Sequence, residues 1–311
     1  SKKDLILQGK VDLNLKTNRI SDMVGSASLK EVFILENQDT EYRIDSLKVT
    51  SNVDSLGNNE VKVISDILSG SFNGKYDVEQ LPNTLLYFVE THYPGFANRL
   101  KIRGKIDSNQ IANSFVFKLN ILDSKDLNRL ISPTLGPLKD GLVEGYYQGD
   151  NQKMSLILEL PSLNINNVDF RDLTFRFDAE SDNAFMSLVI DSTVLNKKTY
   201  FGQANLTSFL TRDTLDFGLT YTQSDSYVEA LKIDGLLYLP DSLNYKIQFK
   251  PSDLEIMETK WNISKDNFIV FGKNYLRTKN FKLVNEDSVI ELNKEEEKEI
   301  SLKISDFNFD F

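Results

Sequence analysis

The chain of 311 residues contains no cysteine, one histidine and one tryptophan. Without cysteine, disulfide bonds and thiolate metal sites are excluded, and strand pairing must supply the stability that disulfides give to many proteins of oxidising compartments. With His92 as the single imidazole, a Ser-His-Asp triad or a multi-histidine metal site has no histidine to spare. We therefore predict no catalytic residue, no metal site and no cofactor, and we do not expect an enzyme.

A long apolar run and an excess of positive charge are also missing. No stretch approaches the roughly 18 apolar residues that a membrane-spanning helix needs. Lys and Arg total 36 against 46 Asp and Glu, a net charge of −10, which disfavours nucleic acid as a partner. The chain begins at Ser1 without an initiator Met and ends on the strand-like run 307–311, so we expect a piece of a longer polypeptide.

What the sequence does contain is alternation. From Asp172 to Ala179 every second residue is apolar and every intervening residue is polar, which is the period of a strand with one dry and one wet face. Similar segments, separated by Asn, Asp, Ser and Gly turns, recur along the chain. Roughly twenty short strands exceed the about ten that an open sheet usually holds without curling or splitting. The sequence therefore predicts an all-β fold with an elongated, strongly curved sheet.

Two segments change period and predict short inserted helices, near 82–92 and 124–131. In the first, Pro82 suits the first helical position and Pro94-Gly95 marks the stop. We expect its apolar side to pack against the concave side of the sheet. The alternative, a helix lying on a membrane, is disfavoured because the flanks carry glutamates and no basic cluster. In the second segment, Ser124 is the expected cap and Pro133 the end.

Glycines spaced by four, Gly141, Gly145 and Gly149, form the most regular motif in the chain. A phosphate-binding loop would lead into a helix, whereas a strand pattern follows here. These glycines are therefore expected to mark tight bends or bulges of a curved sheet.

The run from Leu138 to Asp150, preceded by the helix-like 127–131 and followed by the strand from Phe170, resembles the repeats of TamB and its AsmA-like relatives. Residues 65–72 and 261–268 resemble them in the same way. The resemblance implies a β-taco, a long groove of stacked strands lined by apolar side chains. Residues 1–311 would form one continuous groove segment of a longer protein.

The same resemblance implies a place and a function. It points to the periplasm of a Gram-negative envelope, with attachment to the inner membrane through an anchor outside this segment. A TamB-like protein would shield phospholipid acyl chains during transport to the outer membrane and so support outer-membrane biogenesis. The resemblance also implies an outer-membrane barrel of the TamA type as partner. Removing two acyl chains of about 15 methylenes each from a bilayer into water costs on the order of 25 kcal/mol, so such a track must be apolar throughout.

The candidate lipid-facing residues come from the strands with the clearest alternation. They are Leu156, Leu158, Leu173, Phe175, Phe177, Leu215, Phe217, Leu219, Tyr221, Leu231, Ile233, Leu237, Tyr245, Ile247 and Phe249. For any one of them ordinary core packing is the favoured explanation, because alternation is the mark of every half-buried strand, and only the length of the array favours lipid contact. Two further functions remain open: a structural or adhesive β-array, and a scaffold that adds outer-membrane strands to its edge by β-augmentation.

Overall fold

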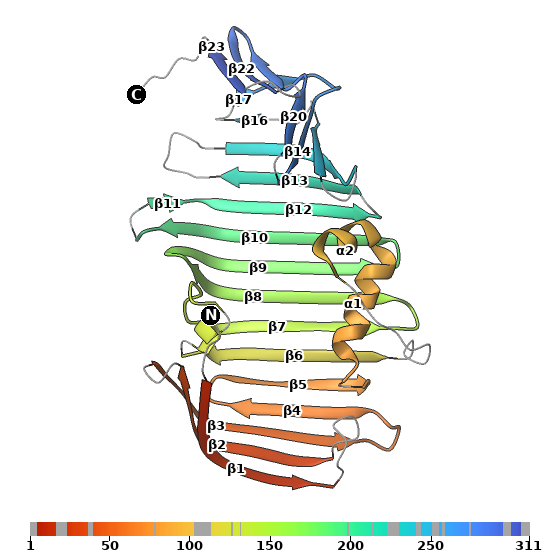
Figure 1. Cartoon of the computed structure of the whole chain (residues 1–311), viewed down its shortest axis with the longest axis vertical. Coiled ribbons are helices and arrows are strands. Elements are labelled where there is room, and N and C mark those ends of the chain that lie inside the picture. Colours follow the sequence, from red (N-terminus) through yellow and green to blue (C-terminus); the bar gives the residue numbers. More distant parts are fainter. Residues whose placement is uncertain are drawn as a thin grey trace. The chain divides into compact units, whose positions relative to one another are not determined.

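The computed structural model describes residues 5–16, 24–36, 40–77, 79–102, 113–125, 127–130, 132–197, 199–212, 214–222, 230–240, 244–250, 255–256, 259–273, 275–294 and 300–305. The described chain is almost entirely β-strand, with two short α-helices and one 3₁₀ turn (Figure 1). Its strands pair antiparallel throughout. The predicted class, an all-β chain on a large antiparallel sheet with short inserted helices, is confirmed.

The chain divides into two compact units. The first consists of Ser1–Tyr87, Gly104–Ser181 and Ile190–Tyr200, and the second of Phe88–Arg103, Asp182–Val189 and Phe201–Phe311. Helix α1 (Leu81–His92) and strands β10 (Asn183–Leu195) and β11 (Thr199–Phe201) each contribute residues to both. The prediction that residues 1–311 form one continuous groove segment stays a prediction.

In the first unit each strand pairs with the next one in the sequence. Short turns make this order the natural one for antiparallel strands. The strands are β1 (Leu5–Leu15), β2 (Gly25–Glu36), β3 (Thr40–Val53), β4 (Asn59–Ser65), β5 (Leu68–Lys75), β6 (Ser114–Asp123), β7 (Lys139–Gln148), β8 (Lys153–Ile165) and β9 (Val168–Glu180). Several are much longer than the short strands that the sequence predicts.

The second unit is also antiparallel, although some strands pair with a later one and not with the next, and it ends in a small separate sheet. Its main ladder comprises β12 (Gln203–Thr211), β13 (Thr214–Thr222), β14 (Ala230–Tyr238), β15 (Asn244–Phe249), β16 (Glu255–Ile256), β17 (Thr259–Lys260), β19 (Phe268–Gly272) and β20 (Tyr275–Lys279). The small sheet contains β18 (Asn262–Ile263), β21 (Lys282–Asn285), β22 (Ser288–Asn293) and β23 (Ser301–Ser305).

The helix expected near 82–92 is present as α1, and it ends before Pro94-Gly95 as predicted, but the helix that follows was not predicted. The chain leaves α1 at His92 and enters a second helix, α2 (Pro94–Leu100), at the proline. Proline ends one helix and is equally suited to the first position of the next, because that position needs no N–H donor. His92 is the last residue of α1 and is buried against the ring of Phe88.

The helix expected at 124–131 is reduced to a single 3₁₀ turn, η1 (Leu127–Leu130). Among the described residues of this segment, no helical N–H bonds to the Ser124 side chain. Its hydroxyl instead bonds to the Asn128 amide at 2.7 Å and accepts from the N–H of Leu138 at 2.8 Å. The buried Asn128 amide donates to the carbonyl oxygen of Leu135 at 2.8 Å, so side chain-to-loop bonds replace helical ones.

Candidate functional site

A row of directly opposed residues crosses all nine paired strands of the first unit. Each of its members is small or apolar: Leu13, Ala27, Val49, Val63, Gly70, Leu119, Val143, Leu158 and Phe175. Directly opposed residues of antiparallel strands project to the same side of a sheet. The row therefore defines a continuous apolar face from β1 to β9, called the apolar face below.

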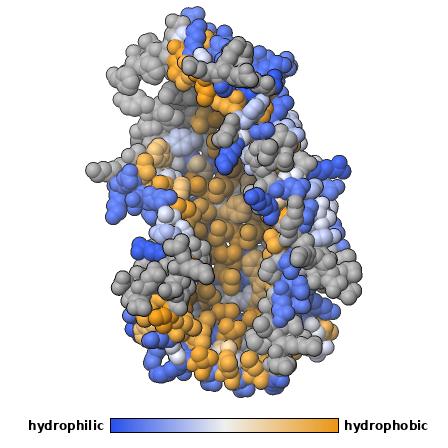
Figure 2. Space-filling view, viewed as in Figure 1, coloured by the Kyte–Doolittle hydropathy of each residue, from blue (hydrophilic) through white to orange (hydrophobic). Residues whose placement is uncertain are grey.

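A second row runs beside the first, two residues further along each strand. It contains Leu15, Gly25, Ser51, Val61, Phe72, Phe117, Gly145, Leu156 and Phe177. Ser51 is its one polar member, and this side chain is buried. Figure 2 shows apolar residues gathered in the hollow over β6 to β9. The apolar face is thus at least two side chains wide.

The intervening residues form a polar face on the other side of the same strands. One such row contains Asn14, Ser26, Thr50, Lys62, Ser71, Lys118, Glu144, Ile157 and Arg176. Lys118 and Glu144 form an ion pair at 3.0 Å between neighbouring strands. This pair is largely exposed and contributes little stability, so its main effect is to keep this face wetted.

The apolar face is not sealed like an ordinary core. Leu13 is 61% exposed and Val11 59%, whereas Phe175, Phe177, Leu156 and Leu158 are partly exposed. Burial is complete at a few positions of this face, among them Leu160 (4% exposed), Leu173 (7%), Phe115 (5%) and Tyr147 (6%). Most of the five residues predicted from this unit therefore line a surface that water reaches.

Glycines let the strands of this face approach one another closely. A Cβ atom on Gly145 would lie 2.2 Å from the carbonyl oxygen of Ser155 and 2.9 Å from Cζ of Phe117. A Cβ on Gly141 would lie 2.7 Å from Cδ2 of Leu160. The expectation that Gly141 and Gly145 mark tight places in the sheet agrees with these distances, whereas Gly149 lies in the turn after β7.

Aromatic rings close one end of the apolar face. Phe72 stacks on Phe115 with ring centroids 4.7 Å apart and meets Tyr76 edge-on at 4.5 Å. Phe115 also contacts Tyr147, at 5.6 Å. Burial raises the pKa of Tyr76 to about 12, and burial with Tyr87 nearby raises the pKa of Tyr147. Both phenols therefore stay neutral and add no charge to the face at physiological pH.

Helix α1 is attached near this aromatic end. The buried Asn113 side chain, just before β6, donates to the Thr84 hydroxyl at 2.9 Å. Thr84 and Asn113 are 2% and 8% exposed, while Leu85, on the next helical position, is 36% exposed. The helix is thus attached through a polar contact. Leu85 is partly exposed whereas Phe88, on the same apolar side, is 1% exposed, and the expectation that this side packs against the concave face stays a prediction.

In the second unit the ten predicted residues also share one face. Leu215, Phe217, Leu219 and Tyr221 of β13 oppose Leu237, Gly235, Ile233 and Leu231 of β14. Leu237 in turn opposes Ile247, and Gly235 opposes Phe249; Tyr245 opposes Phe271 and stacks on it at 5.4 Å. The sequence therefore grouped these side chains correctly, and the intervening Gly235 was missed.

Part of this second face is covered by the chain itself. Ile233 and Phe249 pack against a buried cluster of Trp261, Ile263 and Leu283. The Asn267 amide, 1% exposed, bonds with both the N–H and the carbonyl oxygen of Phe249, each at 2.9 Å. Two of the predicted lipid-facing residues, both partly exposed, therefore pack against the core cluster of the second unit.

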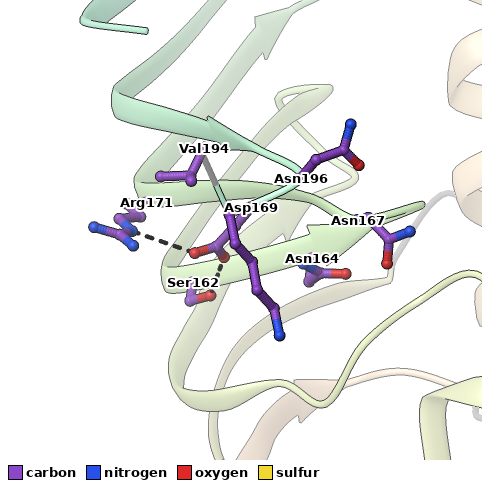
Figure 3. A pocket seen from close by; sticks show the side chains of 8 residues that line it. Ser162, Asn164, Asn167, Asp169, Arg171, Val194 and Asn196 are labelled. Atoms are coloured by element: carbon purple, nitrogen blue, oxygen red, sulfur yellow. Dashed lines mark hydrogen bonds and ion pairs between the residues drawn. The ribbon is translucent and has the colours of Figure 1, made fainter. Parts of the chain in front are cut away.

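A polar pocket of about 510 Å³ lies in the first unit where β8 and β9 meet the turn after β10 (Figure 3). Asp169 stands at its centre, accepting from the Ser162 hydroxyl at 2.6 Å and from Nε of Arg171 at 3.2 Å. The asparagines Asn164, Asn167 and Asn196 lie on the other side of Asp169 from Arg171. Sequence reasoning missed this pocket.

Comparisons with protein-family models, with curated proteins and with solved structures found no match. Among the described residues, no group of three or more His, Cys, Asp or Glu side chains is placed to hold a metal ion. No α-helix in the described part of the chain has the length and apolarity needed to cross a bilayer.

Proposed function

We propose that the chain binds phospholipids through the apolar face and shields their acyl chains from water during transfer between membranes. The observation that carries the proposal is the unbroken row of nine apolar or glycine positions, still partly open to solvent, across β1 to β9. An exposed apolar surface of this extent is unusual on a monomeric protein and generally marks a binding surface.

The free energy of removing acyl chains from water supports a lipid as the ligand of the apolar face. An acyl chain gains roughly 0.8 kcal/mol for each methylene removed from water, so even partial coverage by the face binds it usefully. Strands advance about 4.8 Å each across a sheet, so nine strands offer a track of roughly 40 Å. The polar opposite face keeps the carrier wetted while the apolar face is occupied.

The resemblance to TamB and AsmA-like repeats supports a more specific form of the proposal. In that form the chain is a periplasmic segment of an inner-membrane-anchored protein that moves phospholipid towards the outer membrane and supports its biogenesis. A barrel of the TamA type would be its partner at the outer membrane. This placement depends on the resemblance, whereas the lipid-binding face depends on the register of the strands.

Photo-crosslinking tests the lipid-binding face without disturbing it. A benzophenone amino acid at Phe175 projects on the apolar face, and the same group at the exposed Thr174 projects on the polar face of the same strand. After incubation with phospholipid vesicles and illumination, mass spectrometry is expected to find phospholipid attached at position 175 and little at 174. Equal labelling at both positions, or none at either, contradicts the proposal.

A second function, a scaffold that adds strands at its edge, has one observation in its favour. In the described chain β1 pairs on one side alone, with β2, and its residues Leu7, Val11 and Leu13 are 59–67% exposed. An apolar edge strand is a ready template for another strand. Proline in place of Val11 removes an N–H from this edge. It is expected to abolish capture of a strand peptide while leaving phospholipid crosslinking at Phe175 intact.

A further inference from the structure

The apolar face turns polar partway along β8 and β9. In β8 the alternating positions Met154, Leu156, Leu158 and Leu160 are followed by Ser162 and Asn164; in β9 Ala179, Phe177, Phe175 and Leu173 are followed by Arg171 and Asp169. The pairing register does not shift at this point, since Leu160 opposes Leu173 and Ser162 opposes Arg171. The polar pocket therefore begins one row beyond the last apolar pair.

The backbone bends where the character changes. Asp172 adopts a left-handed conformation, with φ of 47°, and lies opposite Pro161, which has no N–H to donate to the ladder. Beyond the bend, the turns of the two hairpins are joined because the N–H of Asn196 donates to the carbonyl oxygen of Asn167 at 3.1 Å. The pocket walls are thus built by paired strands and a bonded pair of turns.

The side chains of the pocket suit a phosphate that carries further polar groups. Arg171 and Lys197 supply positive charge, and the Arg171 contact with Asp169 uses Nε, not the terminal nitrogens. Asparagine amides add neutral donors, and Asp169 can accept from an ammonium or hydroxyl group. Its described lining includes no aromatic ring of the kind on which a sugar would stack. A volume of about 510 Å³ is in the range of small-ligand sites.

We propose that this pocket binds the phosphodiester headgroup of the lipid whose acyl chains lie on the apolar face. The inference rests on the proposed function and assigns the polar end of the same ligand. From Met154 to Leu160 the apolar stretch of β8 spans about 20 Å, which accommodates the about 15 Å of hydrocarbon that one leaflet of a bilayer provides. A lipid lying along β8 and β9 therefore reaches the pocket with its headgroup.

Strand β9 provides a matched control for Arg171. Arg171 and Arg176 are both exposed, and each pairs through Nε with an aspartate two residues away, Asp169 and Asp178. Arg171 lines the pocket, whereas Arg176 lies in the row of the polar face. The test variants are the double change Arg171→Gln with Lys197→Gln, and Arg176→Gln alone.

Binding to the purified chain is measured with two fluorescent lipids that share the same acyl chains, a phosphatidylethanolamine and a diacylglycerol. The double variant is expected to bind phosphatidylethanolamine at least roughly tenfold more weakly, because charge-assisted hydrogen bonds are lost. Its affinity for diacylglycerol is expected to stay unchanged, which also shows that the fold is intact. Arg176→Gln is expected to change neither affinity.

Other outcomes overturn the inference in distinguishable ways. If the double variant binds both lipids as the unmodified chain does, the headgroup lies elsewhere, and the lipid-binding face stands. If inorganic phosphate binds to the pocket but does not compete with phosphatidylethanolamine, the pocket is a site for free phosphate. If the unmodified chain binds neither lipid, the proposed function fails together with the headgroup site.

Discussion

Glycines lie opposite large side chains on neighbouring strands of the first unit, and the missing Cβ of each glycine leaves space for the larger side chain. Gly145 lies between Phe117 of β6 and Leu156 of β8, and Gly70 lies between Val63 and Leu119. Because Phe117 leans over Gly145, a methyl group there would meet the ring at 2.9 Å. The glycines thus shape the face at the scale of single atoms, in addition to bending the strand.

A buried phenol gives a prediction on pH. The pKa of Tyr76 is raised by burial from about 10 to about 12, so the folded state favours the neutral phenol. The stability from this preference is fully present below pH 10 and is lost as pH rises from about 10 to about 12. Between pH 8 and pH 11 the unmodified chain is expected to lose more free energy of unfolding, measured in urea, than Tyr76→Phe.

Tyr76→Phe is a suitable comparison because it keeps the ring contacts with Phe72 and Phe115. It removes the hydroxyl that donates to the carbonyl oxygen of Phe72 at 3.3 Å, so it has a constant cost below pH 10. Tyr93, whose pKa is also raised to about 12, titrates in both proteins and cancels. An equal loss of stability in the two proteins would contradict the assignment.

At the scale of single residues, the alternation of apolar and polar residues correctly predicted which side chains share a face. It did not predict how deeply each side chain is buried. The predicted set in β13 and β14 shares a face because period two decides it within a strand. The packing of Phe249 against the cluster of Trp261, Ile263 and Leu283 depends on a contact between distant segments, which alternation does not encode. The left-handed backbone of Asp172 was missed as well, since aspartate adopts this conformation without a distinctive sequence signal.

Helix α1 depends at its start on one buried polar contact. Thr84→Val preserves the shape of the side chain but leaves the Asn113 amide without its acceptor. The loss of a partner for a buried donor costs about 1–3 kcal/mol. Thr91→Val, on an exposed position of the same helix, is the control and is expected to be nearly neutral.

Hydrogen exchange followed by mass spectrometry locates the effect of Thr84→Val. Residues 81–87 are expected to exchange faster in this variant, while the amides of β8 and β9 keep their protection. Unchanged exchange in 81–87 would mean that the Asn113–Thr84 bond does not hold the helix. Increased exchange throughout the first unit would instead make the helix part of its core.

Among the elements, the strands were easier to predict than their lengths and the breaks between them. The pattern of Tyr275–Val284 predicts one strand, but the chain forms β20 and β21 with left-handed Asn280 between them. Similarly, Asn128 bonds the following loop and limits the expected helix to η1. In both places an asparagine ends the element earlier than the periodic pattern predicts, Asn280 through its left-handed φ and Asn128 through its side-chain hydrogen bonds.

At the scale of the whole molecule, the apolar face of each unit is partly exposed, but in the second unit part of this face also packs against a buried cluster. In the second, the cluster around Trp261 covers Ile233 and Phe249. In the first, the row from Leu13 to Phe175 has partly exposed members throughout. We therefore place the proposed lipid-binding surface chiefly on the first unit. The register that aligns this row over nine strands follows from turn lengths and bulges, and the sequence pattern of single strands does not reveal it.

The central claim is that the apolar face of the first unit is a binding surface and not a sealed core. A carboxylate at Phe175 distinguishes the two, because a charge in the path of an acyl chain opposes binding, whereas on a partly exposed site it stays hydrated. Burial of an unpaired aspartate in a sealed core would instead cost several kcal/mol. Thr174→Asp, on the polar face of the same strand, is the matched control.

The most direct test measures thermal unfolding and phospholipid transfer between vesicles on the same preparations of Phe175→Asp and Thr174→Asp. For Phe175→Asp we expect transfer to be lost while the Tm falls by only a few degrees, consistent with a cost of about 1 kcal/mol. Thr174→Asp is expected to retain both transfer and Tm. A collapse of the Tm in Phe175→Asp, or undiminished transfer by this variant, would contradict a lipid-binding face.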